Sequence, residues 1–244
     1  MLKAAILSAI NQVHIIDISH EIDKFNIIQA AYVFGNAFAN FPKGSIHVLG
    51  IKAGNDKNER YFALKLEDQF ILCPDNGIIS LLNEQGKPNT LKELPVSPKE
   101  KSLFFVRDIL VPEACKLAID LAYFESLPNA INPKQILSYH PTSNDFSITG
   151  RCIYIDSYGN VITNITKDFF ERCRNGRAFT IFLPGKKITK ICLNYNDVSE
   201  IDPVALFNSA GHLEIAINKG QAKQLLFPRN FNSHTDFNIT IEFS

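Results

Sequence analysis

Residues 26–51, NIIQAAYVFGNAFANFPKGSIHVLGI, decide the fold of the N-terminal half of this chain. From Ile27 to Phe41 the apolar side chains recur at the i, i+3, i+4, i+7 spacing of an amphipathic helix. Asn26 is a favourable N-cap residue, and Pro42-Lys43-Gly44 ends the helical pattern. The short apolar run over 45–51 then predicts a buried strand.

The neighbouring segments extend this pattern to an α/β domain. Residues 2–10 have helical spacing, and the apolar run over 13–18 (VHIIDI) suits a buried strand. A strand–helix–strand order favours a mostly parallel sheet with helices packed on its faces. Further along, the sequence predicts an antiparallel strand pair (60–66 and 69–72), two helices (77–82 and 108–123) and a surface loop (84–101).

A change of pattern divides the chain. Residues 131–149 are rich in Pro, Asn and Ser, which is typical of a linker. From Arg151 onward, short apolar runs alternate with turn residues, and only 166–173 has helical spacing. We therefore predict an α/β domain over residues 1–130, followed after the linker by an all-β, barrel-like domain over 150–244.

The composition argues against several classes of protein. Lys+Arg and Asp+Glu number 25 each, so the zero net charge gives no broad attraction to nucleic acid or to an anionic membrane. No apolar run approaches the roughly 18 residues that a membrane span needs. The five cysteines are odd in number and lack CxxC spacing, which argues against a disulfide framework and a zinc site. We expect a cytoplasmic protein with reduced cysteines, no metal and no cofactor.

The stretch DSYGNVITN (156–164) begins with a tight turn that has two interpretations. The simpler one is a β-hairpin with Asp and Asn as turn formers, and this feature alone favours it. The other is a nucleobase site, because Asp156, Tyr158 and Asn160 offer an acid, an aromatic face and a carboxamide. The stretch NSAGHLEIA (208–216) is a second tight turn, which alone again predicts a hairpin.

A polar cluster, Asp17-Ile18-Ser19-His20, follows the first predicted strand. Ligands of parallel α/β sheets bind at the carboxyl ends of strands. A histidine fixed by hydrogen bonds to nearby backbone is the favoured interpretation of His20, ahead of a ligand-binding role.

Taken in order, six motifs resemble one known family. They are DISHEI (17–22), AAYVFGNAFANFPKGSIHV (30–48), PDNGIISLL (74–82), RDILVPEA (107–114), YIDSYGNVITNI (154–165) and NSAGHLEIAINKGQA (208–222). They resemble the S-adenosyl-L-methionine (SAM) hydroxide adenosyltransferases, also called SAM hydrolases, which are related to the fluorinase and chlorinase. The resemblance covers nearly the whole chain.

This resemblance implies a fold, an assembly and a reaction. The fold is an N-terminal α/β domain followed by a C-terminal β-barrel-like domain. The assembly is a homotrimer that binds its ligand between the N-terminal domain of one subunit and the C-terminal domain of the next. The reaction displaces methionine from the 5′ carbon of the ribose, so that SAM and water give adenosine and L-methionine.

The resemblance also implies substrate-binding residues for the adenosine end. Tyr158 matches the stacking aromatic residue of the family, and Asn160 matches the amide that reads the adenine. Phe25 matches an aromatic residue beside the adenosine, and Tyr195 matches a second stacking residue.

Two further positions match the methionine end of the ligand. Asp156 matches the acid that faces the methionine ammonium, and Ser209 matches a residue near the carboxylate. The arginine that the halogenases carry beside this serine is Ala210 here.

The sequence departs from the family where water is activated. Lys52 replaces the Asp of a DPG-type turn, and Phe105 replaces the His of an FHGRD motif. The family arginine falls at Glu59 or Arg60, and Asp56 and Glu59 are candidates for a replacement base. Water is a weak nucleophile until a base is placed beside it, and losing one such base costs at least about 100-fold in rate.

The sequence is compatible with three functions. One is a SAM hydrolase that is weak or has a rebuilt base, with Arg60, Asp56 and Glu59 as the candidate catalytic residues. Another is a trimer that binds adenosine or SAM without turnover, and the third is a structural trimer with no ligand. A halogenase is disfavoured, because Val106 replaces the hydroxyl side chain expected at the halide pocket.

The start of the chain also differs from the family. The family opens with a strand and a TDFG-type motif whose Asp holds the ribose hydroxyls. The first residues here, MLKAAIL, resemble the helix that follows that motif. We therefore expect the N-terminal sheet of this chain to lack the family's first strand.

Overall fold

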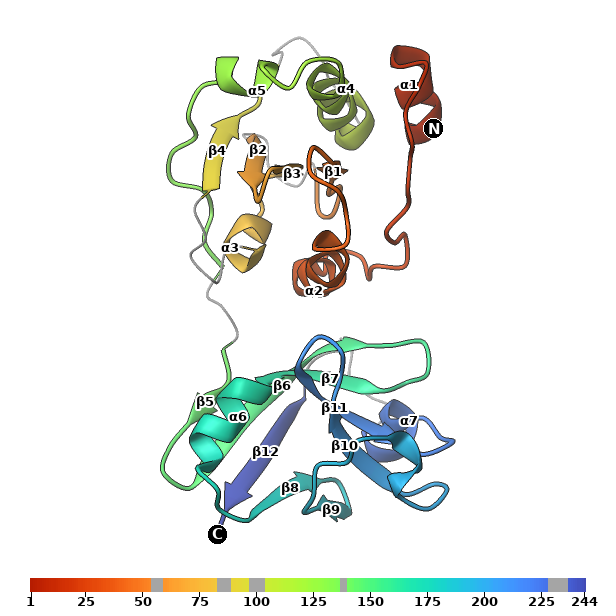
Figure 1. Cartoon of the computed structure of the whole chain (residues 1–244), viewed down its shortest axis with the longest axis vertical. Coiled ribbons are helices and arrows are strands. Elements are labelled where there is room, and N and C mark those ends of the chain that lie inside the picture. The colour runs from red at the N-terminus through yellow and green to blue at the C-terminus, as the bar shows by residue number, and fades with distance from the viewer. Residues whose placement is uncertain (54–58, 83–88, 97–103, 137–139, 228–236) are drawn as a thin grey trace. The chain divides into compact units, whose positions relative to one another are not determined.

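The computed structural model describes residues 1–53, 59–82, 89–96, 104–136, 140–227 and 237–244 (Figure 1). The chain divides into two compact units, the N-terminal unit (Met1–Ser138) and the C-terminal unit (Tyr139–Ser244). Each has a hydrophobic core of its own. The N-terminal unit combines helices with a sheet and the C-terminal unit is mostly strands, which confirms the predicted order of fold classes.

The helix predicted from residues 26–51 is present as α2 (Ile27–Phe38). The side chain of Asn26 caps its first turn by accepting a hydrogen bond of 3.0 Å from the backbone N–H of Gln29. Ile27, Phe34 and Phe38 are buried along one face of the helix. Strand β1 (Ile46–Val48) follows, as the sequence predicts.

The predicted strand over 13–18 is wrong. Helix α1 (Leu2–Ala9) forms as expected, but residues 13–18 adopt no strand. Ile16 is 66% exposed, and the carboxylate of Asp17 forms an ion pair with Lys3 and lies 3.4 Å from Nε2 of His20. An apolar run can form a buried strand only if a neighbouring strand pairs with it, and the structure gives this segment no such partner among the described residues.

The N-terminal sheet is mixed, which corrects the prediction of a mostly parallel sheet. Its four strands lie in the order β1-β3-β2-β4. Only β1 and β3 (Gln69–Pro74) run parallel, whereas β2 (Tyr61–Leu66) is antiparallel to both β3 and β4 (Asn89–Glu93). The cause is a tight turn at Glu67 and Asp68, which both have positive φ (48° and 62°), as the turn of a two-residue hairpin requires.

Strand β4 was not expected, because it falls within the predicted surface loop over 84–101. Helix α3 (Ile78–Leu82) lies where the sequence predicts it. The helix predicted over 108–123 is divided into a π-helical turn, η1 (Val106–Leu110), the helix α4 (Val111–Ile119) and the short helix α5 (Tyr123–Ser126).

Helices cover both faces of the N-terminal sheet (Figure 1). Alternate residues of β2 point to opposite faces. Phe62 packs with α2 and α3 in one core, and Tyr61 packs with η1 and α4 in the other. The sheet is therefore the middle of three layers.

The C-terminal unit is an eight-stranded antiparallel sheet that is nearly closed into a barrel. Its strands are β5 (Thr142–Ser143), β6 (Ser147–Ile155), β7 (Val161–Thr166), β8 (Phe179–Leu183), β9 (Lys186–Ile188), β10 (Pro203–Phe207), β11 (His212–Ile217) and β12 (Asn238–Phe243). They lie in the order β10-β11-β7-β6-β12-β8-β9, with β5 paired to β6. The predicted barrel-like architecture is confirmed.

Helix α6 (Lys167–Arg174) closes the C-terminal core. Thr166 caps it by accepting a hydrogen bond from the backbone N–H of Phe169. Phe170 of this helix is fully buried and packs edge-on against Phe179. The short helices η2 (Tyr195–Asp197) and α7 (Ala222–Leu226) lie between the later strands.

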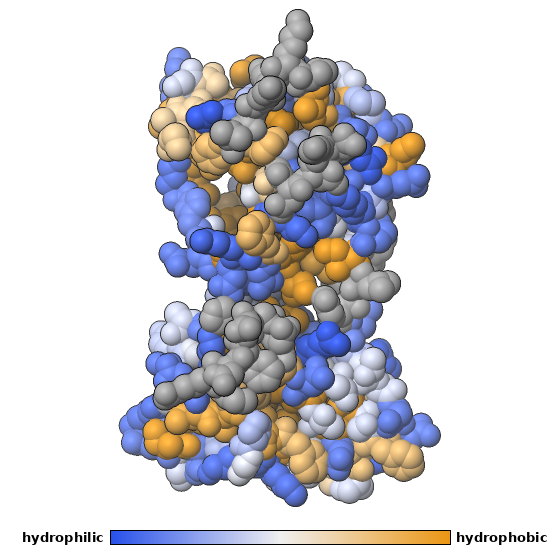
Figure 2. Space-filling view, turned by 180° about the vertical axis from the view of Figure 1, so that it is seen from behind, coloured by the Kyte–Doolittle hydropathy of each residue, from blue (hydrophilic) through white to orange (hydrophobic). Residues whose placement is uncertain are grey.

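Large apolar side chains reach the surface of both units (Figure 2). In the C-terminal unit Leu193, Tyr158 and Phe146 are the most exposed of them, and in the N-terminal unit Met1, Ile119 and Ile131. Across the described residues, no helix is both long and apolar enough to cross a membrane.

Candidate functional site

The turn between β6 and β7 is built around the carboxylate of Asp156. Its Oδ1 accepts hydrogen bonds from the backbone N–H groups of Tyr158 (2.9 Å) and Asn160 (2.8 Å). Its Oδ2 accepts a third hydrogen bond, of 3.0 Å, from Nδ2 of Asn160. Asn160 is buried, whereas Tyr158 is 76% exposed. The structure thus brings the three predicted residues together, with the aromatic ring outermost.

This turn is fixed to the start of α7. The carbonyl of Gly159 accepts a hydrogen bond of 2.9 Å from the backbone N–H of Lys223. Gly159 has a φ of 78°, and a Cβ atom there would lie 3.0 Å from Cβ of Gln221. Glycine is therefore favoured at this position by both its backbone conformation and its close neighbour.

The turn between β10 and β11 has the same construction. Oδ1 of Asn208 accepts hydrogen bonds of 3.1 Å from the backbone N–H groups of Ala210 and His212. Gly211 has a φ of 77°, matching that of Gly159. Ser209 is exposed at the tip of this turn. Each loop thus begins with an Asx side chain that accepts from two backbone N–H groups, and each has glycine at its fourth residue.

A tyrosine–glutamate pair connects η2 to β11. The Tyr195 hydroxyl donates a hydrogen bond of 2.7 Å to Oε1 of Glu214. Burial raises the pKa of Tyr195, and the hydrogen bond to Glu214 and the charges of Glu214 and Asp156 raise it further. Tyr195, Glu214 and Asp156 therefore lie close enough to influence one another.

Glu214 was not singled out from the sequence. It is 4% exposed and lies in the apolar run LEIAI. A carboxylate within such a run is unusual unless it is paired, so the run itself contained a usable signal.

In the N-terminal unit, the positions predicted to depart from the family pattern lie in one region. Lys52 follows β1, is exposed and has a φ of 51°. Gly50 approaches η1 so closely that a Cβ atom there would lie 2.7 Å from Cγ2 of Val106. The ring of Phe105, just before η1, is stacked on that of Tyr61 at a centroid distance of 6.4 Å.

Of the predicted replacement bases, Glu59 belongs to the same region. Its Oε2 accepts a hydrogen bond of 2.8 Å from the hydroxyl of Tyr61. Burial raises the pKa of Tyr61, and the hydrogen bond and charge of Glu59 add to this effect. Asp56 lies outside the described residues.

Arg60 is engaged in structural contacts. Nη2 donates hydrogen bonds to Oδ2 of Asp75 (2.7 Å) and to the carbonyl of Asn132 (2.8 Å), and Nη1 donates to the carbonyl of Ile131 (2.9 Å). The guanidinium also lies over the ring of Phe62. These contacts join the end of β3 to residues 131–132.

Phe25 stands immediately before the N-cap of α2. It is exposed and has a φ of 65°, which is uncommon for a bulky residue. Nearby in the sequence, Nε2 of His20 lies 3.4 Å from Oδ1 of Asp17. His20 therefore has a side-chain carboxylate beside it, where backbone partners were expected.

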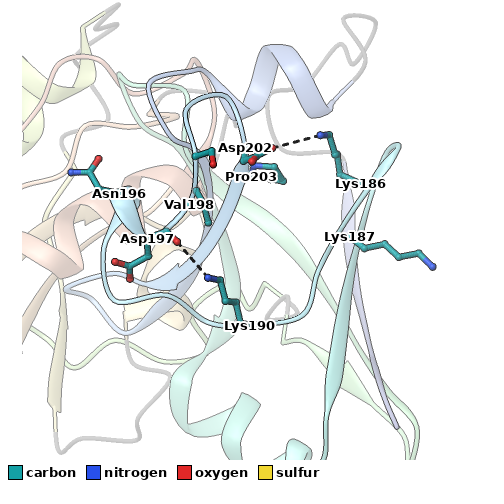
Figure 3. A pocket seen from close by; sticks show the side chains of 9 residues that line it. Lys186, Lys187, Lys190, Asn196, Asp197, Val198, Asp202 and Pro203 are labelled. Carbon is teal, nitrogen blue, oxygen red and sulfur yellow. Dashed lines mark hydrogen bonds and ion pairs between the residues drawn. The ribbon is translucent and has the colours of Figure 1, made fainter.

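An open cavity of about 680 Å³ lies in the C-terminal unit (Figure 3). Its lining includes Lys186, Lys190, Asp197 and Asp202, and none of the predicted site residues. The lysines are already engaged, since Lys186 pairs with Asp202 and Lys190 donates to the carbonyl of Asp197 (Figure 3). Among the described residues, no cluster of His, Cys, Asp and Glu could hold a metal ion. The candidate site therefore consists of the β6–β7 turn, the β10–β11 turn and Tyr195.

Known proteins resemble this chain over most of its length. It is 28% identical to an "(R)-S-adenosyl-L-methionine hydrolase" of Methanocaldococcus jannaschii, over 87% of this chain and 78% of that protein. It is 26% identical to one of Thermus thermophilus, over 87% and 83%. A fluorinase of Actinopolyspora mzabensis is 21% identical, over 98% and 91%.

Solved structures share the fold. An uncharacterized conserved protein from Thermotoga maritima has a TM-score of 0.83 at 25% identity, covering 98% of this chain and 93% of its own. Two sequence families also match, the SAM hydroxide adenosyltransferase N-terminal domain over residues 1–126 and the corresponding C-terminal domain over 150–229. This chain belongs to the SAM hydroxide adenosyltransferase family.

Proposed function

We propose that this protein binds SAM and hydrolyses it to adenosine and L-methionine. Both halves of the chain match the family, and relatives at 26% and 28% identity are named SAM hydrolases. One observation carries the proposal to this chain, namely the turn that brings together Asp156, Tyr158 and Asn160.

In this proposal each group of the turn has a ligand to recognise. The exposed ring of Tyr158 stacks on the adenine, and Asp156 faces the ammonium of the methionine moiety. The hydrogen bond from Nδ2 of Asn160 to Asp156 orients the amide, so that Oδ1 accepts from the exocyclic amine of adenine. Tyr195 provides the second aromatic surface, Phe25 flanks the adenosine, and Ser209 meets the carboxylate.

The chemical step is a displacement at carbon. A water oxygen bonds to the 5′ carbon of the ribose while the bond from that carbon to the sulfonium sulfur breaks, and the sulfur keeps the electron pair. The sulfonium leaves as the neutral thioether of methionine, and a base takes the proton from water. Glu59 and Asp56 are the proposed bases. Arg60 is the third proposed catalytic residue, and it acts while its guanidinium donates to Asp75.

A second function is a trimer that binds adenosine or SAM without turnover. Two substitutions favour it, since a water-activating acid and a histidine of the family are Lys52 and Phe105 here. Phe105 stacks on Tyr61, whose hydroxyl is bonded to Glu59. An apolar ring in this place neither donates to water nor accepts a proton from it.

For either function, we propose that the protein is a cytoplasmic homotrimer whose subunits share the ligand sites. Exposed apolar side chains such as Leu193, Phe146 and Ile131 are suited to burial in subunit contacts. All five cysteines are described and none forms a disulfide, which suits a reducing compartment.

The test is incubation of the purified protein with SAM, followed by chromatography for adenosine and methionine. Equal amounts of both products support the hydrolase. Calorimetric binding of adenosine and SAM without products supports the second function, and absence of binding rejects both. Light scattering during gel filtration measures the oligomeric state, and a monomer would contradict shared sites.

A further inference from the structure

Glu214 joins two parts of the candidate site that are far apart in the sequence. It projects from β11, is 4% exposed, and accepts a hydrogen bond of 2.7 Å from the Tyr195 hydroxyl. Its carboxylate is also hydrogen-bonded to the side chain of Asn208. One buried group therefore contacts both the aromatic residue of η2 and the turn that carries Ser209.

The donors and acceptors of Asn208 fix the direction of that second bond. Oδ1 of Asn208 already accepts from the backbone N–H groups of Ala210 and His212. A carboxamide has one oxygen acceptor and one NH₂ donor, and an ionised carboxylate only accepts. Nδ2 of Asn208 therefore donates to Glu214, while the amide oxygen shapes the turn.

The charge around Glu214 makes its position costly without these partners. Burial raises the pKa of Glu214, the charge of Asp156 raises it further, and the bonds from Tyr195 and Asn208 oppose both effects. Among the described residues, no lysine or arginine forms an ion pair with Glu214. Burying a carboxylate that has two side-chain donors and no cation costs desolvation free energy. A leucine at this core position would avoid that cost.

We propose that Glu214 is a positioning residue, which orients the Tyr195 ring for the adenosine end of the ligand and holds the Asn208 turn, with Ser209, for the methionine end. This inference rests on the proposed binding of SAM. It goes beyond that proposal because one carboxylate then orients groups at both ends of the site, without a proposed ligand contact of its own. The Tyr195 contact then affects adenosine and SAM alike, whereas the Asn208 contact affects SAM alone.

Three variants separate the two contacts by calorimetric binding of adenosine and of SAM. Tyr195→Phe removes only the hydroxyl, so both ligands weaken by the same factor, about 2- to 10-fold, the value of one hydrogen bond. Glu214→Ala removes both contacts, so SAM weakens more than adenosine. Glu214→Gln keeps an oxygen that accepts from Tyr195 but presents an amide to Asn208, so adenosine binding stays within about 2-fold while SAM weakens.

A matched control exists in the N-terminal unit. The Tyr123 hydroxyl donates to the buried carboxylate of Glu113, so Tyr123→Phe deletes the same kind of bond outside the candidate site. It should leave both affinities unchanged. Thermal unfolding of every variant verifies that it folds, and Glu214→Gln, which keeps the size of the side chain, keeps the test valid if Glu214→Ala unfolds.

The outcomes distinguish this inference from the function beneath it. If the unmodified protein binds neither ligand, the proposed function fails. If it binds both, and the ratio of SAM to adenosine affinity is the same in all three variants, the positioning role of Glu214 is wrong. A ratio that changes with Glu214→Ala and Glu214→Gln but not with Tyr195→Phe supports it.

Discussion

The region around Lys52 and Phe105 and the pair of turns around Asp156 and Asn208 differ in how well they fit the predicted family pattern. In the turns, the predicted binding groups are present and satisfy one another by hydrogen bonds. In the N-terminal region, the residue predicted to replace a family acid is the exposed Lys52, and the residue predicted to replace a family histidine is Phe105, which is stacked on Tyr61.

This difference distinguishes ligand binding from catalysis. Binding groups cooperate in one network, so replacing one leaves buried polar atoms without partners. Phe105 needs no hydrogen-bond partner in the N-terminal region, and it gains packing by stacking on Tyr61. The comparison predicts that ligand affinity is retained here more fully than turnover.

The largest expected effect is a gain of activity from rebuilding the N-terminal region. Lys52→Asp combined with Phe105→His should raise the rate of adenosine release by about 100-fold, the contribution of a positioned general base. The affinity for adenosine should not change. Turnover is measured by chromatography at saturating SAM.

The control for this gain is Lys52→Asn combined with Phe105→Gln, which is polar but has no base of suitable pKa. Equal rates in the two double variants would mean that the gain comes from polarity alone. No gain in a folded double variant that still binds SAM would contradict the contrast between the two regions.

The next effect concerns the two similar turns. Gly159→Ala forces a side chain into left-handed backbone and toward Gln221, whereas Gly211→Ala meets nothing within 4 Å. We expect the free energy of unfolding to fall by about 2 kcal/mol for Gly159→Ala and by about 1 kcal/mol for Gly211→Ala. Urea denaturation followed by circular dichroism measures both, and equal losses would show that the contact with Gln221 contributes nothing.

A smaller effect is expected when the charge of Asp156 is removed. Asp156→Asn keeps an oxygen that accepts from the backbone but loses the charge that faces the ammonium. SAM should bind about tenfold more weakly, corresponding to about 1.5 kcal/mol for a hydrogen bond to a charged group. Adenosine has no ammonium, so it should lose less affinity than SAM, namely only what the lost bond between Asn160 and Asp156 contributes. Calorimetry of both ligands decides, and an equal loss for both would mean that Asp156 acts only through the shape of the turn.

Local patterns predicted much of the fold. Asn26 and the apolar spacing that follows it define α2, and the short strands of the C-terminal unit were predicted from turns and alternation. The antiparallel pair β2–β3 was predicted correctly, but the sheet is not mostly parallel, because residues 13–18 form no strand and β4 adds a second antiparallel pairing.

The site was predictable only in part. Asp156, Tyr158 and Asn160 share one turn, so sequence proximity placed them together. The bond between Tyr195 and Glu214 joins residues 19 positions apart, and no local pattern encodes such a distance. The engagement of Arg60 with Asp75 and with the carbonyl of Ile131 depends on tertiary folding in the same way.

The smallest expected effect is on the pH dependence of stability. It concerns two buried titratable groups, one in each unit. His47 of β1 lies among the rings of Phe34, Phe38 and Phe41, at centroid distances of 5.0, 5.6 and 5.1 Å, and its Nε2 is 2.8 Å from Oε1 of Gln69. Burial lowers the pKa of His47, although the bond to Gln69 opposes this. For Glu214, in contrast, burial raises the pKa.

These shifts give stability opposite dependences on pH. Below about pH 6.5, the unfolded chain protonates His47 more readily than the folded chain, so stability falls as the pH falls, by at most about 1.4 kcal/mol per pH unit. The folded chain holds a proton on Glu214 more readily than the unfolded chain, so its contribution falls as the pH rises above the ordinary glutamate value of about 4.3. Unfolding of the unmodified protein, His47→Gln and Glu214→Gln between pH 4.5 and 7.5 isolates each group, because the other titrating residues cancel in the differences. Relative to the unmodified protein, His47→Gln should lose least stability at the acidic end and Glu214→Gln least at the neutral end. If both stability differences changed in the same direction with pH, this last contrast between the units would be contradicted.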